Sequence, residues 1–334
     1  MKEIQAILRR VQSAPGPWVL ATLVSVEGSS YRRAGARALI AANGDRLGSI
    51  SGGCLEEDVL VRAARVRTCG KAELARYDTT SENDLVWGVG LGCHGIVRVL
   101  IEPLSAQAPW LAAAAAALGG GAPCEVQVLW ESSGNEKLGT GLASEHEIPA
   151  PNSRRLIQKF HAPTKLFVFG AGDDAQPLVR MAAELGWRVT VADPRAAYAT
   201  PERFPEAHRW VVGRIEQLIA ETQPPAGATA VIMTHHYIHD LPLLHALLPR
   251  PLAYLGLLGP KKRAERMLDV VGAEGLAVTP EMRARLFAPV GLDLGAEGPD
   301  EVALSIIAEI QATLAARDAR PLRERQGPIH DEQH

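Results

Sequence analysis

Short apolar runs alternate with stretches of helical spacing along the second half of the chain. The runs are residues 165–169, 187–192, 209–212, 229–233 and 252–257. This alternation predicts a parallel sheet whose strands are joined by crossover helices. A final helix is predicted over residues 300–316, and the charged tail that follows, residues 317–334, is expected to be mobile.

The first half of the chain has a less regular pattern. It opens with an amphipathic helix that places Ile4, Ile7, Leu8 and Val11 on one face. Strands are predicted over residues 18–26, 36–42, 71–78, 96–101 and 125–130, and helices over residues 55–68 and 110–118. Prolines interrupt residues 141–164, which are expected to be irregular.

The pattern as a whole predicts an α/β protein with two domains. Residues 1–150 would form an N-terminal α/β domain with mixed strands, and residues 151–164 a linker. Residues 165–316 would form a C-terminal Rossmann-like domain with a doubly wound parallel sheet. A length of 334 residues and a hydrophobic content of 47% are sufficient for two cores.

Composition and charge argue against nucleic acid and membranes as binding partners. The net charge of −3 gives no electrostatic attraction for nucleic acid or for an acidic membrane surface. The four cysteines include no C-x-x-C pair, so they indicate neither a zinc framework nor a disulfide scaffold. The N-terminus lacks the pattern of a signal peptide, and the alanine run at residues 112–117 is far shorter than the roughly 20 residues of a membrane span. We therefore expect a cytoplasmic protein.

The second half carries a dinucleotide-binding fingerprint. The run at residues 165–169 leads into G-A-G-D-D-A, with Gly170 and Gly172 in the turn, and Asp193 lies 21 residues beyond Gly172. In this pattern the turn receives a pyrophosphate at a helix N-terminus, and the acid binds a ribose. Asp173 and Asp174 add negative charge where the pyrophosphate would bind. The sequence therefore also fits a nucleotide-type fold whose site has drifted.

Two further segments follow predicted strands of the same sheet, where the ligands of such folds bind. The segment T-H-H-Y-I-H-D covers residues 234–240. If it is helical, His235 and His239 lie on one face, where the two imidazoles would bind a metal ion or contact another ligand. Helix capping with solvated histidines is the alternative. In G-L-L-G-P-K-K-R, Gly259 and Lys261 lie where a basic helix begins, which favours a bound anion because cations oppose the helix dipole. A solvated basic face is the alternative there.

Arginines gather in one loop of the first half. Arg32, Arg33 and Arg37 are spaced among small residues between two predicted strands. Guanidinium groups bind phosphate in a bidentate manner, so this loop is a candidate site for an anionic ligand.

Two cysteines of the first half lie among glycines. Cys54 follows Gly52 and Gly53, and Cys93 lies between Gly92 and Gly95. Glycines allow the backbone to approach a ligand closely, and a thiolate there would coordinate a soft metal centre or act as a nucleophile. A buried, inert thiol is the alternative for each cysteine.

These motifs together resemble the xanthine dehydrogenase accessory factor family, the XdhC/CoxI proteins. The resemblance covers both predicted domains, from about residue 10 to residue 315. The segments that carry it are G-S-S-Y-R-R-A-G-A (28–36), G-S-I-S-G-G-C-L-E (48–56), residues 90–103 with G-L-G-C-H-G and I-E-P, the G-A-G turn with D-P-R (193–195), T-H (234–235), Y-L-G-L-L-G (254–259) and P-V-G-L-D-L-G (289–295).

The resemblance implies a maturation factor for molybdenum hydroxylases such as xanthine dehydrogenase. Such a protein binds molybdenum cofactor, shelters it while an oxo ligand is exchanged for sulfur, and delivers it to the apoenzyme. In the family a cysteine followed by two glycines is implicated in holding the cofactor, so Cys93 is the expected ligand of molybdenum. His94 replaces one of those glycines here, and Gly92 stands where some members have a second cysteine. A cysteine desulfurase is a further expected partner, and a homodimer is the expected assembly.

Other functions fit parts of the pattern. An NAD(P)-dependent oxidoreductase would use the Rossmann-like domain, with the first domain as a substrate cap, although no proton donor with supporting partners accompanies the G-A-G turn. A protein-interaction scaffold would use neither site. The Rossmann-like crevice would either hold the nucleotide tail of an extended cofactor or be vestigial.

Overall fold

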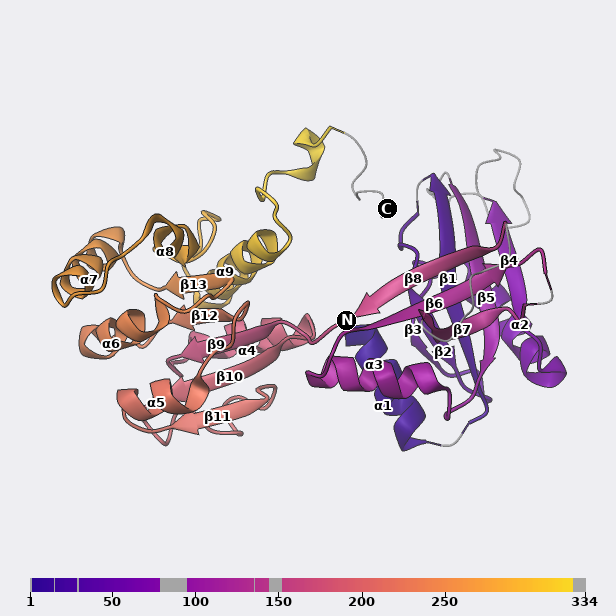
Figure 1. Cartoon of the computed structure of the whole chain (residues 1–334), viewed down its shortest axis with the longest axis horizontal. Coiled ribbons are helices and arrows are strands. Elements are labelled where there is room, and N and C mark those ends of the chain that lie inside the picture. The colour runs from indigo at the N-terminus through magenta and orange to yellow at the C-terminus, as the bar shows by residue number, and fades with distance from the viewer. Residues whose placement is uncertain are drawn as a thin grey trace. The chain divides into compact units, whose positions relative to one another are not determined.

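The computed structural model describes residues 2–14, 16–28, 30–78, 95–134, 136–143 and 152–326. The chain forms two compact units, residues 1–163 and 164–334, which we call the N-terminal unit and the C-terminal unit (Figure 1). Each unit has its own sheets and its own hydrophobic clusters. We describe each unit by itself.

Five strands of the N-terminal unit, within the described ranges, form one antiparallel sheet, which we call sheet A. Its strand order is β3-β2-β1-β5-β4. The strands are β1 (Trp18–Gly28), β2 (Arg37–Ile40), β3 (Arg46–Gly48), β4 (Glu73–Asp78) and β5 (Gly95–Leu104). Four of the strands lie where the sequence predicts them. The short edge strand β3 was not predicted, because three residues that are exposed or half-buried leave no apolar pattern to read.

A second, three-stranded sheet of this unit, sheet B, has the order β7-β6-β8. Its strands are β6 (Cys124–Glu131), β7 (Gly139–Leu142) and β8 (Arg154–Phe160). Strand β8 corrects the prediction of a linker over residues 151–164, because it pairs antiparallel with β6 and belongs to the N-terminal unit. Its outward positions include the exposed Ile157, and its inward positions include the polar Gln158. The sequence therefore lacks the apolar-inward, polar-outward alternation by which a strand is predicted.

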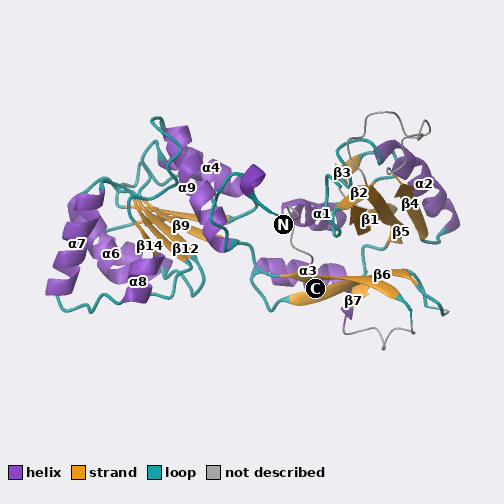
Figure 2. Ribbon diagram, turned by 90° about the horizontal axis from the view of Figure 1, so that it is seen from above, coloured by secondary structure: helices purple, strands orange, loops and turns teal. Residues whose placement is uncertain are grey.

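Helices cover both faces of sheet A. Helix α2 (Glu56–Cys69) packs on one face through Val59, Ala63 and Val66. Helices α1 (Lys2–Ser13) and α3 (Pro109–Gly119) pack with sheet B on the other face. Figure 2 shows α2 and sheet B on opposite sides of sheet A. The N-terminal unit is therefore layered, with hydrophobic clusters on both faces of its central sheet.

The C-terminal unit has a fully parallel sheet with strand order β11-β10-β9-β12-β13-β14. Numbered in chain order this is 3-2-1-4-5-6, the order of the Rossmann fold, which confirms the predicted fold class. The strands are β9 (Lys165–Phe169), β10 (Arg188–Asp193), β11 (Arg209–Val212), β12 (Thr229–Ile232), β13 (Tyr254–Leu257) and β14 (Leu286–Phe287). Strand β14 was not predicted, because two half-buried residues form no recognisable run.

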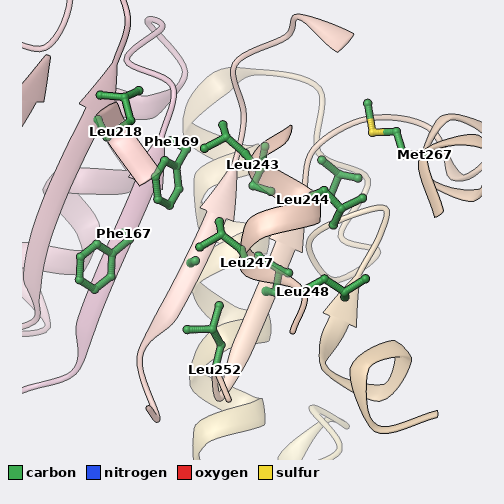
Figure 3. Packing of buried hydrophobic residues seen from close by; sticks show 14 of the residues in the cluster. Phe167, Phe169, Leu218, Leu243, Leu244, Leu247, Leu248, Leu252 and Met267 are labelled. Atoms are coloured by element: carbon green, nitrogen blue, oxygen red, sulfur yellow. The ribbon is translucent and has the colours of Figure 1, made fainter. Parts of the chain in front are cut away.

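Helices enclose the parallel sheet on both faces (Figure 2). One face packs against α5 (Ile215–Thr222), α6 (Tyr237–Leu247) and α7 (Lys261–Ala273), and Figure 3 shows this core with Phe167 and Phe169 of β9 and leucines from α5 and α6. The other face packs against α4 (Ala175–Glu184) and α9 (Pro299–Leu314). The short helix α8 (Pro280–Arg285) precedes β14.

The last described residues include a 3-10 turn, Leu322–Glu324. The mobility expected for residues 317–334 stays a prediction. Among the described residues, no helix has both the length and the apolar character needed to cross a bilayer.

Candidate functional site

Three glycine-bearing segments of the first half leave sheet A in the same direction along its strands. Gly28 at the end of β1 pairs with Gly95 at the start of β5, and Asp78 at the end of β4 pairs with the next residue of β5. Strand β2 begins and β3 ends on the same side but nearer the middle of β1, because Arg37 pairs with Thr22 and Gly48 pairs with Ala38, which lies opposite Ala21. The strand ends that face this way are Gly28, Arg37, Gly48, Asp78 and Gly95, and we call them the loop edge.

Three connections leave the loop edge. They are residues 29–36, residues 49–55 and residues 79–94. The predicted Gly92 and Cys93 belong to the third connection and lie outside the described residues, whereas Gly95 is the first residue of β5. The pairing of Gly28 with Gly95 therefore places the end of one predicted segment beside the end of another that lies far along the chain, which the sequence alone did not reveal.

The first two connections touch each other. A β-carbon on Gly52 would lie 3.6 Å from the Tyr31 ring, so the ring packs on the glycine backbone. Tyr31 is itself 72% exposed. Arg32 forms an ion pair with Glu3 of α1, and Arg33 is exposed. The loop edge thus presents an aromatic ring and a basic side chain to solvent.

A buried carboxylate that sequence reasoning missed fixes the S-G-G-C segment. Glu56, the first residue of α2, accepts hydrogen bonds from Ser49 Oγ at 2.8 Å, from Ser51 N at 3.0 Å and from Ser51 Oγ. Burial alone would raise the pKa of Glu56, but the hydrogen bonds from Ser51 and Ser49 lower it to about 2. Glu56 could have been identified from the sequence because it follows Ser51 by five residues and begins a predicted helix.

Cys54 is exposed beside this fixed segment, with its thiol free. Gly53, the preceding residue, has φ of +119°, and a β-carbon there would meet nothing within 4 Å. The segment therefore holds an accessible sulfur next to an open stretch of main chain. This combination is chemically suited to a ligand that needs both a soft donor and close approach of backbone.

Arg37 does not join Arg32 and Arg33 at the surface. Its side chain is 3% exposed and lies on the face of sheet A that packs against α3 and β8, with its guanidinium carbon 5.8 Å from the Trp110 ring centroid and 5.6 Å from that of Phe160. The three predicted arginines are therefore not one cluster.

In the C-terminal unit, the first glycine of the G-A-G turn serves close packing of the backbone. Gly170 has φ of +117°, and a β-carbon there would lie 2.3 Å from Met233 O. It therefore allows the turn after β9 to lie directly against the end of β12. A β-carbon on Gly172 would meet the side chain of Asp174 at 2.5 Å.

Asp193, the predicted ribose-binding acid, is fully buried and fully hydrogen-bonded. Its Oδ2 accepts from Ala171 N at 2.7 Å and from Arg195 Nη2 at 2.8 Å, and its Oδ1 accepts from Arg195 N at 2.8 Å and Nε at 2.9 Å. Burial opposes ionisation, but these hydrogen bonds hold the pKa of Asp193 below its usual value. A carboxylate accepts about four hydrogen bonds, so no acceptor is free for a ribose hydroxyl.

Three more carboxylates at this edge have cationic or imidazole partners. Arg203 Nη2 lies 2.8 Å from Asp173 Oδ1, and Arg263 Nη2 lies 2.6 Å from an oxygen of the buried Asp240. His235 Nε2 lies 2.7 Å from Asp174 Oδ2. Asp173 and Asp174, which add negative charge to the dinucleotide-binding turn, are thus paired with Arg203 and His235.

His235 lies before α6 in a left-handed conformation with φ of +62°, so it does not share a helical face with His239. The described residues contain no group of three or more side chains suited to a metal ion. Gly259 precedes α7 with φ of +128°, and Lys261, the first residue of α7, is exposed. The basic start of α7 is explained in part by Arg263, which neutralises Asp240.

Comparison with known proteins gives consistent results for both units. Residues 11–78 match the model of the XdhC and CoxI family, and residues 166–310 match the model of the XdhC Rossmann domain. The chain is 36% identical over 314 residues to a probable subunit of xanthine dehydrogenase from Bacillus subtilis (strain 168), covering 88% of this chain and 92% of that protein. It is 24% identical over 301 residues to the molybdenum cofactor insertion chaperone PaoD of Escherichia coli (strain K12), covering 87% and 82% of the two chains.

A solved structure leads to the same assignment. The crystal structure of a xanthine dehydrogenase from Bacillus halodurans is similar with a TM-score of 0.80 and 31% sequence identity. The similarity covers 95% of this chain and 97% of that one. The chain therefore belongs to the XdhC and CoxI family.

Proposed function

We propose that this protein is a maturation factor that binds molybdenum cofactor at the loop edge of its N-terminal unit and delivers it to the apoenzyme of a molybdenum hydroxylase. The single observation that carries this site is the way in which the ends of the glycine-bearing segments meet, with Gly28 paired to Gly95 and Gly52 packed against Tyr31. The similarity to a molybdenum cofactor insertion chaperone supports the class of cargo.

The residues at the loop edge fit the chemistry of such a cargo. Molybdenum cofactor is a phosphorylated pterin with a dithiolene that holds the metal. Cys54 and Cys93 would offer thiolate sulfur to molybdenum, and Gly52, Gly53, Gly92 and Gly95 would let the pterin approach the main chain. Arg32 and Arg33, each after exchanging the interaction it makes within the chain, would bind the phosphate.

The C-terminal unit would serve the cargo in a different way. Its Rossmann order provides a crevice where the strand order reverses, between β9 and β12. Since Asp193 is saturated by Arg195 and Ala171, a ribose there would have to displace Arg195. We therefore propose that this unit contributes little affinity for NAD(P), and that the competing function of an NAD(P)-dependent oxidoreductase is disfavoured.

A retention experiment tests the proposed function. The purified protein is incubated anaerobically with molybdenum cofactor, or with NAD⁺ or NADP⁺, and passed through a desalting column, and the retained molybdenum and nucleotide are measured. We expect retained molybdenum and no retained dinucleotide. Tight retention of a dinucleotide without molybdenum would favour the oxidoreductase.

Cysteine variants place the site. Cys93→Ala and Cys54→Ala are expected to reduce retained molybdenum while the fold is kept. Cys69→Ala is the matched control, because Cys69 is also free and exposed but ends α2, roughly 20 Å along the helix from Cys54. If all three variants retained the same amount of molybdenum, the cofactor would not bind at the loop edge.

Delivery is tested with the apoenzyme of a molybdenum hydroxylase. We expect loaded protein to restore its activity faster than free cofactor does, and Cys93→Ala protein to give no advantage over free cofactor. The homodimer and the cysteine desulfurase partner are separate proposals, which sedimentation and pull-down measurements would test.

A further inference from the structure

Tyr31, on the first connection from the loop edge, presents one face of its ring to solvent. Three consecutive ring atoms, Cγ, Cδ1 and Cε1, lie 3.6, 3.6 and 3.8 Å from the position that a β-carbon on Gly52 would take. Such nearly equal distances place Gly52 against a face of the ring, because an atom beside the ring edge would be markedly nearer to one of the three. Since the side chain is nevertheless 72% exposed, the opposite face of the ring is open.

The open face distinguishes Tyr31 from the other four tyrosines, all of which lie in described parts of the chain. Two are fully buried and a third is half-buried against a hydrophobic cluster; they are Tyr77, Tyr254 and Tyr237. The fourth, Tyr198, has the guanidinium carbon of Arg195 3.7 Å from its ring centroid. Within the described residues, the Tyr31 side chain has no hydrogen bond, no ring contact and no cation over its ring. Its face is therefore available to a ligand.

Both connections that meet at this contact are fixed by hydrogen bonds. Beside Gly52, Ser51 N donates to Glu56 Oε1 at 3.0 Å. On the other connection, Gly35 N donates to Leu23 O of β1 at 2.7 Å. A ring supported by fixed backbone loses little freedom when a ligand stacks on it, so more of the contact energy is retained as affinity.

The ring lies within reach of the free thiol of the S-G-G-C segment. Gly52 and the exposed Cys54 are two residues apart, so their α-carbons are separated by at most about 7 Å. A pterin is a flat heteroaromatic ring system, and such rings stack on aromatic side chains. In molybdenum cofactor the pterin and the dithiolene that holds the metal belong to one small molecule. One ligand can therefore contact both the ring and the sulfur.

We propose that Tyr31 is the stacking platform for the pterin ring of the cargo. Its open face stacks on the pterin, and Gly52 supports the opposite face. This inference rests on the proposed function and deepens it, because it names the part of the cofactor that the first connection recognises. A nucleobase of an extended cofactor is the other flat ring that the cargo could supply, and the two sources are separated by experiment.

The release of cofactor from the loaded, full-length protein tests the platform. The protein is loaded anaerobically with plain or with nucleotide-extended molybdenum cofactor and diluted, and the molybdenum that stays with it is measured over time. We expect Tyr31→Ala to release the plain cofactor about 5 to 150 times faster than wild type, the range found when a stacking aromatic is removed. A loss confined to the extended cofactor would show that the ring stacks on the nucleobase, and would overturn the proposal.

Three further variants identify what the ring contributes. Tyr31→Phe keeps the aromatic face and is expected to release cofactor at close to the wild-type rate, whereas Tyr31→Leu, apolar but without a π face, should resemble Tyr31→Ala. Tyr198→Ala is the matched control, because it removes a tyrosine of the C-terminal unit whose ring is already covered by Arg195, and it should change nothing. Circular dichroism checks that each variant is folded.

Failure of this inference differs from failure of the proposed function. If wild type retains molybdenum but Tyr31→Ala releases it less than about five times faster, or if Tyr31→Phe releases it as fast as Tyr31→Ala, the stacking platform is overturned and the proposed function stands. If wild type retains no molybdenum, the proposed function fails. Biopterin, a fluorescent pterin without the dithiolene, then decides on Tyr31: saturable quenching that Tyr31→Ala removes supports the platform, and its absence from wild type overturns it.

Discussion

Gly170→Ala should destabilise the C-terminal unit far more than an ordinary glycine substitution. The variant adds a β-carbon at a residue with φ of +117°, a conformation that L side chains rarely adopt. It also places that carbon 2.3 Å from Met233 O and 2.6 Å from Met233 C, both backbone atoms at the end of β12. Because the backbone cannot rotate away as a side chain can, β9 and β12 must separate.

The magnitude follows from two contributions. Backbone strain costs about 1–2 kcal/mol for an L residue in the left-handed region. A relaxed carbon–oxygen contact is about 3.3 Å, so the strands must move apart by about 1 Å. This weakens the hydrogen bond from Met233 N to Phe169 O, now 2.8 Å long, at a cost of about 1 kcal/mol, and opens the packing beneath it. We expect a total of about 3–4 kcal/mol.

Gly227→Ala separates the two contributions. Gly227 also has positive φ, at +75°, but a β-carbon there would meet nothing within 4 Å. It should therefore show backbone strain alone, about 1 kcal/mol. The two variants differ in the contact with Met233, which Gly227 lacks.

Hydrogen exchange measured by mass spectrometry reports each unit separately. Peptides from β9 and β12 should exchange faster in Gly170→Ala than in Gly227→Ala, by a factor of about 30 for a difference of 2 kcal/mol. Peptides from sheet A serve as the internal reference and should be unchanged. If Gly170→Ala lowered the free energy of unfolding no more than Gly227→Ala, Gly170 would not be required for strand packing. Ligand binding would then be the better explanation for a glycine at this position.

Three other carboxylate and hydroxyl contacts give predictions of the same kind. Asp193→Asn should cost about 2 kcal/mol at neutral pH, because a neutral amide cannot accept all the hydrogen bonds from Arg195 and Ala171. Since the folded pKa of Asp193 is depressed, its stabilisation is present above the ordinary carboxyl pKa and is lost as pH falls through the folded value, so urea titrations of wild type and variant should converge in acid. Glu56→Gln should cost about 2 kcal/mol in the same assay. Because the pKa of Glu56 in the folded protein is about 2, the difference in unfolding free energy between wild type and variant should persist at pH 4 and vanish only near pH 2. Equal unfolding free energies already at pH 4 would contradict the hydrogen bonds from Ser49 and Ser51. Tyr254→Phe should cost about 1.5–3 kcal/mol, because the buried hydroxyl donates to Glu309, which also accepts from Gly291 N; an unchanged urea midpoint would show that water replaces this contact.

The sequence predicted strands β9, β10, β12 and β13 of the parallel sheet because those strands are buried on both faces. Their apolar runs are continuous, and a run such as Leu166–Phe169 is buried at every position. Strand β8 was missed for the opposite reason. Its inward positions include the polar Gln158 and its outward positions the apolar Ile157, so the strand lacks the alternation by which a half-buried strand is recognised.

The candidate site was predicted in its parts but not in its arrangement. The glycines and Cys54 were identified from their local pattern, whereas the placement of Gly28 beside Gly95 and of Gly52 against Tyr31 depends on contacts between distant segments. Such long-range register is not encoded in any one segment. Arg37 was grouped with Arg32 and Arg33 by sequence distance, but the pleat of β2 turns its side chain into the interior.

The electrostatics of the two units argue that cargo binds to the N-terminal one. At the strand ends of the C-terminal unit, Asp193 and Asp240 are buried and each is held by an arginine of the chain itself. An anionic ligand that used Arg195 or Arg263 would have to compete with an internal carboxylate for the same guanidinium, at a cost of about 1.5–3 kcal/mol for each charged hydrogen bond exchanged. At the loop edge of sheet A the corresponding carboxylate, Glu56, is instead occupied in fixing the backbone, and the adjacent Cys54 is left free. A ligand at the loop edge would gain contacts to Cys54 without breaking the network of Glu56, which favours the proposal that the cofactor binds to this unit.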